Sequence, residues 1–184
     1  MRYAPRMPNA LIIFGGLPGT GKTTIARELA KLIGAVHVRI DSIEQALLSS
    51  SLAIQHVNDA GYRVGYSVAW DNLAVGRTVI ADSVNPLPIT RDAWVEVAKR
   101  ARVQALEIEM TCSDAAEHCR RVETRTTDIR GHRLPTWQEV ISRDYRPWNR
   151  KHLTIDTAHG SVDQIVEMIR AALVSQTRKR LKLQ

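Results

Sequence analysis

The stretch Gly16-Leu17-Pro18-Gly19-Thr20-Gly21-Lys22-Thr23 matches the pattern G-x-x-x-x-G-K-[ST] at every fixed position. It follows the apolar run Ala10-Leu11-Ile12-Ile13-Phe14 and precedes a helical pattern that starts at Thr24. A buried strand, a glycine-rich turn and a helix in this order are the context in which the pattern forms a phosphate-binding loop. A turn built for packing alone would need no lysine followed by a hydroxyl. The sequence therefore predicts a site for a nucleoside triphosphate.

The loop positions have distinct expected roles. The glycines allow backbone N–H groups to curl around a phosphate chain, and the helix N-terminus adds partial positive charge. Lys22 is expected to reach the β- and γ-phosphates, and the Thr23 hydroxyl to ligate Mg²⁺. Within this stretch, the predicted nucleotide-binding residues are the loop and the residue after it: Gly16, Leu17, Pro18, Gly19, Thr20, Gly21, Lys22, Thr23 and Thr24; Arg121, further along the chain, completes the set.

Length and composition limit the class of protein. The chain has 184 residues, of which 44% are hydrophobic, enough for one domain with a substantial core. No apolar run approaches the roughly 20 residues of a membrane-spanning helix. Residues 1–9 are basic, but the apolar stretch after them is too short for a signal peptide, so we expect a disordered leader and a cytoplasmic protein.

The net charge of +7 invites a nucleic-acid interpretation, but its distribution weakens it. One basic group lies at the end, within residues 176–184, where a solvated basic tail explains it. A second group falls between residues 120 and 133, where phosphate handling explains it. One Phe, four Tyr and four Trp form no evident platform for stacking bases. Nucleic acid is therefore a partner that the sequence does not favour.

Strand and helix patterns alternate along the chain. The expected strands are 10–14, 36–40, 78–81, 104–110 and 153–155, and the expected helices are 21–33, 42–49, 62–75, 90–101, 114–125, 136–145 and 161–174. This alternation predicts one α/β domain over residues 10–175, with a parallel five-stranded sheet covered by helices on both faces. Ligands of such sheets bind beyond the carboxyl ends of the strands.

Two aspartates follow expected strands at that end of the sheet. Asp41 ends the second strand and Asp82 the third, so both should lie on the rim that carries Lys22 and Thr23. Either could instead cap the helix that follows, and for Asp41 a cap and a catalytic base are equally consistent with the sequence. Asp82 resembles the acidic residue that assists Mg²⁺ in phosphate-loop enzymes, often through water. Two carboxylates beside one phosphate loop favour a functional role.

Other nucleotide-hydrolysing classes fit poorly. Motor ATPases of the AAA+ type place a glutamate after this aspartate, where the chain has Ser83, and are expected to need a longer chain. The guanine-reading motif Asn-Lys-x-Asp is absent. Asp128-Ile129-Arg130-Gly131 matches the GTPase pattern D-x-x-G, but it follows an expected helix and not a strand, so we interpret it as a chance match.

An arginine-rich stretch before the fifth strand predicts a lid. Arg121 and Arg125 are four residues apart and therefore share one helix face, and a polar segment over 126–135 follows them. Arginines on a mobile segment suit phosphoryl transfer, because they neutralise the transferring group while the segment excludes water. The other interpretation is a solvated basic helix in which Glu117 pairs with Arg121. The position in a phosphate-loop domain favours a lid at about 121–136.

These segments together resemble the small phosphate-loop kinases that include zeta toxins, chloramphenicol phosphotransferase, gluconate kinase and the kinase domain of phage polynucleotide kinase. The resemblance covers most of the chain and rests on the phosphate loop, on Arg39-Ile40-Asp41-Ser42-Ile43, on Val79-Ile80-Ala81-Asp82-Ser83 and on the two lid arginines. It implies a kinase fold that uses ATP. It also implies that Asp41 binds the acceptor hydroxyl and acts as base, and that Arg121 and Arg125 contact ATP phosphates. The acceptor is not identified, because these relatives phosphorylate unrelated molecules.

The segment after Asp41 is expected to build the acceptor pocket. Tyr62, Arg63 and Tyr66 are the predicted acceptor contacts, and Trp70, four residues further on the same stripe, is expected to pack against the sheet. The histidines show no metal-ligand spacing, and none is assigned to a metal.

The resulting hypothesis is an ATP- and Mg²⁺-dependent phosphotransferase that acts on a hydroxyl of a small molecule. Lys22, Asp41, Arg121 and Arg125 are its predicted catalytic residues, and Thr23 and Asp82 its predicted metal residues. Two alternatives stay open. One is a 5′-hydroxyl polynucleotide kinase, consistent with the net charge of +7, and the other is a non-catalytic ATP-binding regulatory module.

Overall fold

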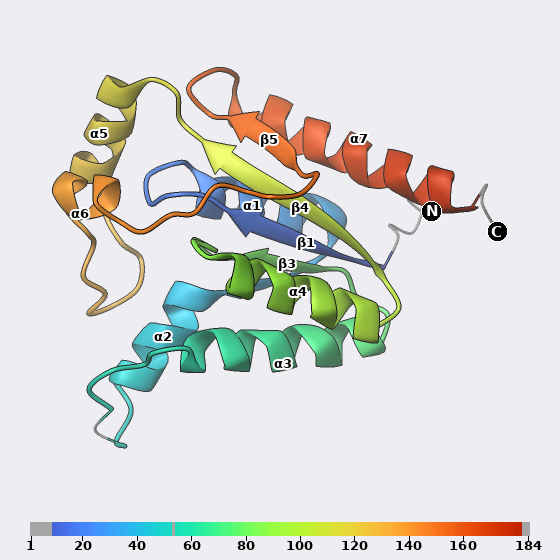
Figure 1. The fold of residues 1–184 in the computed structure, drawn as a ribbon, viewed down its shortest axis with the longest axis horizontal. Coiled ribbons are helices and arrows are strands. Elements are labelled where there is room, and N and C mark those ends of the chain that lie inside the picture. The colour runs from blue at the N-terminus through green and yellow to red at the C-terminus, as the bar shows by residue number, and fades with distance from the viewer. Residues whose placement is uncertain (1–8, 53, 182–184) are drawn as a thin grey trace.

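The computed structural model describes residues 9–52 and 54–181 (Figure 1). Its strands are β1 (Ala10–Gly15), β2 (Val36–Arg39), β3 (Val79–Asp82), β4 (Gln104–Thr111) and β5 (Leu153–Asp156). Its helices are α1 (Lys22–Ile33), α2 (Ile40–Leu48), α3 (Ala60–Ala74), α4 (Pro88–Arg100), α5 (Ala115–Thr124), α6 (Trp137–Ile141) and α7 (Val162–Leu181). Within these ranges, no helix is long and apolar enough to cross a bilayer.

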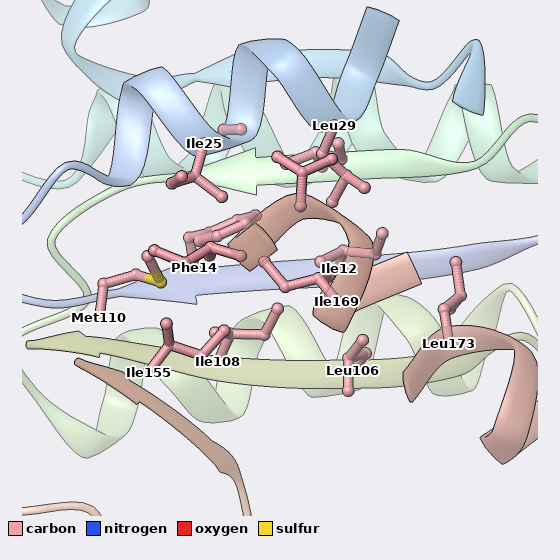
Figure 2. Packing of buried hydrophobic residues seen from close by; sticks show 14 of the residues in the cluster. Ile12, Phe14, Ile25, Leu29, Leu106, Ile108, Met110, Ile155, Ile169 and Leu173 are labelled. Atoms are coloured by element: carbon pink, nitrogen blue, oxygen red, sulfur yellow. The ribbon is translucent and has the colours of Figure 1, made fainter. Parts of the chain in front are cut away.

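The five strands form one parallel sheet in the order β2-β3-β1-β4-β5, which confirms the predicted fold class. Strand β1 is central, and all six of its residues are buried. Its side chains alternate between two cores, as the pleat of a strand requires. Ile12 and Phe14 pack with α1 and α7 on one face (Figure 2), whereas Leu11 and Ile13 pack with α3 and α4 on the other.

Most helix boundaries lie within two residues of the sequence prediction, and the ends of α6 and α7 differ by more. Helix α7 runs to Leu181 and so includes part of the segment predicted as a tail; of the predicted leader, residues 1–8 lie outside the described residues. Helix α6 ends at Ile141, earlier than the predicted residue 145. Residues 144–149, which follow it, belong to no helix or strand. Buried Arg91 holds this segment by donating to the carbonyl oxygens of Arg146 and Pro147, at 2.6 and 3.1 Å.

Helices α2 and α3 approach closely because α3 presents glycines to its neighbour. A Cβ atom at Gly61 would collide with the side chain of Glu44, and one at Gly65 would collide with Ile40. This packing fixes the first turn of α2 at the carboxyl end of β2, where Asp41 lies.

Candidate active site

A cleft of about 650 Å³ lies beyond the carboxyl ends of β1, β2 and β3. The phosphate loop and α1 form one side, the start of α2 forms another, and α5 with the segment leading into α6 covers it (Figure 1). Most of the predicted site residues line this cleft together: Pro18, Gly19, Gly21, Lys22, Thr23, Thr24, Asp41, Asp82, Arg121 and Arg125.

The loop backbone has the conformation that its glycines predict. Gly16, Gly19 and Gly21 have φ values of 134°, 87° and 81°, a region that residues with a Cβ rarely adopt. A Cβ at Gly16 would also collide with the carbonyl of Met110 on β4, so the loop is seated directly against the sheet.

Lys22 is buried at the base of the loop, with 7% of its surface exposed. Its Nζ donates to the carbonyl oxygen of Leu17 at 2.8 Å and to Thr20 Oγ1 at 3.4 Å. Burial lowers the pKa of Lys22 to about 8, although the nearby carboxylates of Asp82 and Asp41 oppose this shift. Bound phosphate would compensate for the lost hydration, so this lysine is suited to an anionic ligand.

The N-terminus of α1 is free of competing acids. Gly21 is its N-cap and has no side chain to accept from the first turn, and that turn holds no acidic residue. The first backbone N–H groups of a helix lack intrahelical partners. With Thr23 and Thr24 in this turn lining the cleft, the N–H groups and hydroxyls together can bind phosphate oxygens.

Asp82 is 3% exposed at the end of β3, and its Oδ2 lies 3.0 Å from Nε2 of His37 on the neighbouring strand β2. Helix α4 begins only at Pro88, so Asp82 is not a helix cap. The described residues contain no group of three or more His, Cys, Asp or Glu side chains able to hold a metal. Mg²⁺ usually keeps several waters and binds through one or two carboxylates plus substrate phosphates. Thr23 and Asp82, which line one cleft with the phosphate loop, fit that mode.

Asp41 also lies in the cleft and is not a helix cap, because the N-cap of α2 is Arg39. Glu44, three residues on, faces the same cleft. Burial raises the pKa of Glu44 to about 7, the Asp41 charge adds to this, and Arg143 opposes it. Sequence reasoning missed Glu44, although its spacing of three residues from Asp41 was a visible signal. It also missed the contact of His37 with Asp82, which depends on the pairing of two strands.

The two lid arginines line the cleft in different ways. Arg121 donates to Glu117 Oε1 at 2.7 Å and to the Thr157 side chain and carbonyl at 3.0 Å each. Thr157 in turn donates to the carbonyl of Thr20 in the phosphate loop at 3.1 Å. Arg125 lies at the end of α5, where burial lowers its pKa and the Asp41 charge opposes the shift. Arg121 is therefore bound through Thr157 to the phosphate loop, whereas Arg125 interacts electrostatically with Asp41.

The segment between α5 and α6 is held in place by ion pairs of Asp128. Its carboxylate forms ion pairs with Arg27 of α1 and with Arg39 at the end of β2, the latter at 2.8 Å. The hydrogen bonds from Arg39 and Arg27 hold the pKa of Asp128 well below its usual range. This pairing gives Asp128 a structural partner on each wall of the cleft.

The predicted acceptor contacts on α3 do not line the cleft. Tyr66 packs edge-on against Trp94 with ring centroids 4.6 Å apart, and Arg63 is exposed and pairs with Asp59 at 2.6 Å. Tyr62 Oη accepts from the backbone N–H of Asn85 at 3.2 Å, and burial raises its pKa to about 12. The reason is helical phase, because α3 turns its tyrosines into the core and presents Gly61 to α2. Trp70, expected to pack inward, is 37% exposed and lies against Arg100.

Comparison with known proteins agrees with this architecture. Residues 11–143 match the model of the family AAA_33, described as an AAA domain. A candidate kinase from Chloroflexus aurantiacus J-10-fl has a similar structure (TM-score 0.70, 24% identity, 94% of this chain and 99% of that chain covered). So do an APS kinase of Mycobacterium tuberculosis in complex with AMPPNP and APS (0.65, 17%, 93% and 99%) and a gluconokinase of Sinorhizobium meliloti 1021 (0.64, 18%, 97% and 99%). No curated protein sequence matches the chain.

Proposed function

The chain belongs to the AAA_33 family of AAA domains, and from this membership and the cleft we propose that it transfers the γ-phosphoryl group of ATP to a hydroxyl of a small molecule, with Mg²⁺. Its fold is that of the phosphate-loop kinases with which it was compared. In the reaction, the acceptor oxygen forms a bond to the γ-phosphorus, the bond from that phosphorus to the bridging oxygen breaks, and ADP leaves.

One observation carries this proposal. Asp41 and Lys22 line the same cleft from different walls, close enough for their charges to interact, and the Arg125 guanidinium is within electrostatic reach of both. A hydroxyl held by Asp41 would therefore face a phosphate held by Lys22. Such positioning, together with charge stabilisation, supplies most of the catalysis in phosphoryl transfer.

The residues then have complementary roles. Lys22 and the loop N–H groups hold the β- and γ-phosphates, and Asp41 orients the acceptor hydroxyl and accepts its proton. Arg121 and Arg125 stabilise negative charge on the nucleotide and on the transferring group. Thr23 and Asp82 would hold Mg²⁺, which when bound neutralises phosphate charge.

The proposal is tested by measuring ADP release from ATP, with and without Mg²⁺, against a panel of sugars, nucleosides, antibiotics, simple alcohols and 5′-hydroxyl oligonucleotides. We expect release to depend on Mg²⁺ and to rise above the background only with a hydroxyl compound of low molecular mass. Stimulation by oligonucleotides alone, with a steep salt dependence, would indicate a polynucleotide kinase instead. Tight ATP binding without release in any reaction would indicate a regulatory module.

A further inference from the structure

The wall of the cleft around Asp41 is rich in arginine. Arg39, Arg125 and Arg143 line the cleft together with the carboxylates of Asp41, Glu44 and Asp128, and Arg27 lines it from α1. Only Asp128 is bound in ion pairs with these arginines, and it takes up Arg27 and Arg39. The raised pKa of Glu44, at about 7, weakens its contribution of negative charge near neutral pH. This wall therefore carries an excess of positive charge before any nucleotide binds.

Asp128 accepts a hydrogen bond from only one of the guanidinium nitrogens of Arg39. Its side chain is 13% exposed, and among the described residues only Nη1 hydrogen-bonds, to Asp128. Its Nε atom is buried without a hydrogen-bond partner in that part of the chain. A guanidinium group offers five donors in a planar fork that matches the oxygens of a carboxylate, sulfate or phosphate. Arg39 thus retains donors at the end of β2, two residues before Asp41.

Arg143 lines the same cleft from the segment just beyond α6. Within the described ranges its side chain has no hydrogen bond or ion pair, although it is close enough to act electrostatically on Lys22, Glu44 and Arg125. Its neighbour Arg146, in contrast, pairs with Asp144 at 2.7 Å and does not line the cleft. The chain therefore directs one unpaired arginine of this segment into the cleft and neutralises the other outside it.

Neither Arg39 nor Arg143 donates a hydrogen bond to the phosphate loop within the described part of the chain. The loop N–H groups, Lys22 and Arg121 lie on the nucleotide side, and Arg125 lies between that side and Asp41. Arg39 and Arg143 line the same cleft as Asp41, which would bind the acceptor in the proposed reaction. Beyond the effect of burial, the charges of Arg39 and Arg143 both act to lower the pKa of Arg125, and an anion bound in this part of the cleft would relieve that repulsion.

We propose that Arg39 and Arg143 form an oxyanion subsite, and that the acceptor is an alcohol that also carries a carboxylate, sulfate or phosphate group. The acceptor class rests on the proposed kinase function, whereas the subsite itself rests on the cleft. The anionic group binds to the arginines and thereby places the hydroxyl at Asp41.

Direct binding tests the subsite without requiring turnover. The protein is loaded with AMPPNP and Mg²⁺, so that the phosphate loop is filled, and is titrated with sodium sulfate at constant ionic strength by calorimetry, with sodium chloride as the reference. We expect one saturable sulfate site. Arg143→Gln should weaken sulfate binding by about 10- to 100-fold, the range expected for a lost hydrogen bond to a charged group. Arg146→Gln is the matched control, and should leave sulfate affinity unchanged.

Arg39→Gln should weaken sulfate binding similarly, with circular dichroism as a check because Arg39 also holds Asp128. Absence of a saturable sulfate site, or equal affinities for the Arg143→Gln and Arg146→Gln proteins, would overturn the subsite. Since Arg143 is exposed and unpaired among the described residues, failure to fold does not complicate its variant.

Turnover tests the acceptor class separately. Neutral alcohols are compared with their anionic counterparts, such as glycerol with glycerate and glycerol 3-phosphate, or glucose with gluconate. We expect at least about tenfold higher kcat/KM for the anionic member of the productive pair, and a loss of that preference through KM in Arg143→Gln. Preferential transfer to neutral alcohols would refute the acceptor class and leave the kinase function standing. A sulfate site that depends on Arg143, without transfer to any alcohol, would support the subsite and refute the kinase function.

Discussion

The two sides of the cleft differ in how completely their polar groups are bound. On the nucleotide side, Lys22 donates to Leu17, Thr157 donates to Thr20, and His118 Nε2 lies 2.8 Å from the carbonyl oxygen of Pro18. On the acceptor side, the Nε atoms of Arg39 and Arg125 are buried without hydrogen-bond partners in the described residues. Internal bonds preorganise a site for a ligand of fixed shape, whereas buried donors without partners are satisfied only when a ligand arrives. The nucleotide side is thus built in advance, and the acceptor side depends on its substrate.

The largest effect that can test this comparison is expected from Asp41→Asn. Loss of the base should lower kcat by about 10²- to 10⁴-fold with ATP affinity nearly unchanged, because Asp41 lies on the acceptor side. Asp82→Asn, measured in parallel, should instead raise the Mg²⁺ concentration needed for half-maximal rate. Steady-state kinetics over a range of Mg²⁺ concentrations measure both. The reverse pattern would exchange the roles of the two aspartates.

A smaller and more discriminating effect concerns the two lid arginines. Arg125→Gln should lower kcat by about 10²- to 10³-fold, as when a group that stabilises the transition state is removed, with little change in KM for ATP. Arg121→Gln should act more on KM for ATP, because Arg121 is bound to Thr157 and through it to the phosphate loop. Equal effects of both variants on kcat alone would show that the two lid arginines do not differ in the way that the nucleotide and acceptor sides of the cleft do.

The smallest effect is a pH dependence of ATP binding. The pKa of Lys22 is lowered from 10.5 to about 8 in the folded protein, and phosphate should raise it again. Between these values the folded protein binds fewer protons at Lys22 than the unfolded chain does, so this residue should make stability rise with pH from about 8 to 10.5. ATP binding should take up a proton in the same window. The affinity for ATP should therefore fall as the pH rises, by at most about tenfold per pH unit.

Calorimetry in buffers of different ionisation enthalpy measures that proton directly. Lys22→Met is the control, because it retains the length of the side chain but cannot titrate. Proton uptake of the same size in Lys22→Met would mean that another group is responsible.

The difference between the two sides also explains what the sequence could predict. The phosphate loop is a local motif whose partners are mostly contiguous residues, so its position on β1 and α1 followed from the sequence. The placement of Asp41 and Asp82 near the phosphate loop could be predicted because the carboxyl ends of parallel strands lie at the same edge of a sheet. Tyr62 and Arg63 were predicted as acceptor contacts because they follow Gly61 at a helix start, and Tyr66 because it lies in the same segment, but the sequence does not indicate which neighbour each face of this helix meets. The pairing of Asp128 with Arg27 joins residues 101 positions apart, and no local pattern indicates such a contact.

Helix α6 was predicted too long for a related reason. The segment after it is held by hydrogen bonds from Arg91 to the carbonyl groups of Arg146 and Pro147, and Arg91 lies on α4, far away in the sequence. The capping box of Thr136 and Glu139, in contrast, is local, and the predicted helix start at residue 136 agrees with it.

The bonds of Arg91 also affect the entropy of substrate binding. They anchor the chain after α6, while His118 and Arg121 anchor α5 to Pro18 in the phosphate loop and to Thr157 after β5. We expect any opening of the cleft to be confined to the connection between these two anchors. The free energy needed to order a connection grows with the logarithm of its length, so a short connection with fixed ends loses little entropy on closing. More of the binding energy of the acceptor then remains for selecting the acceptor itself.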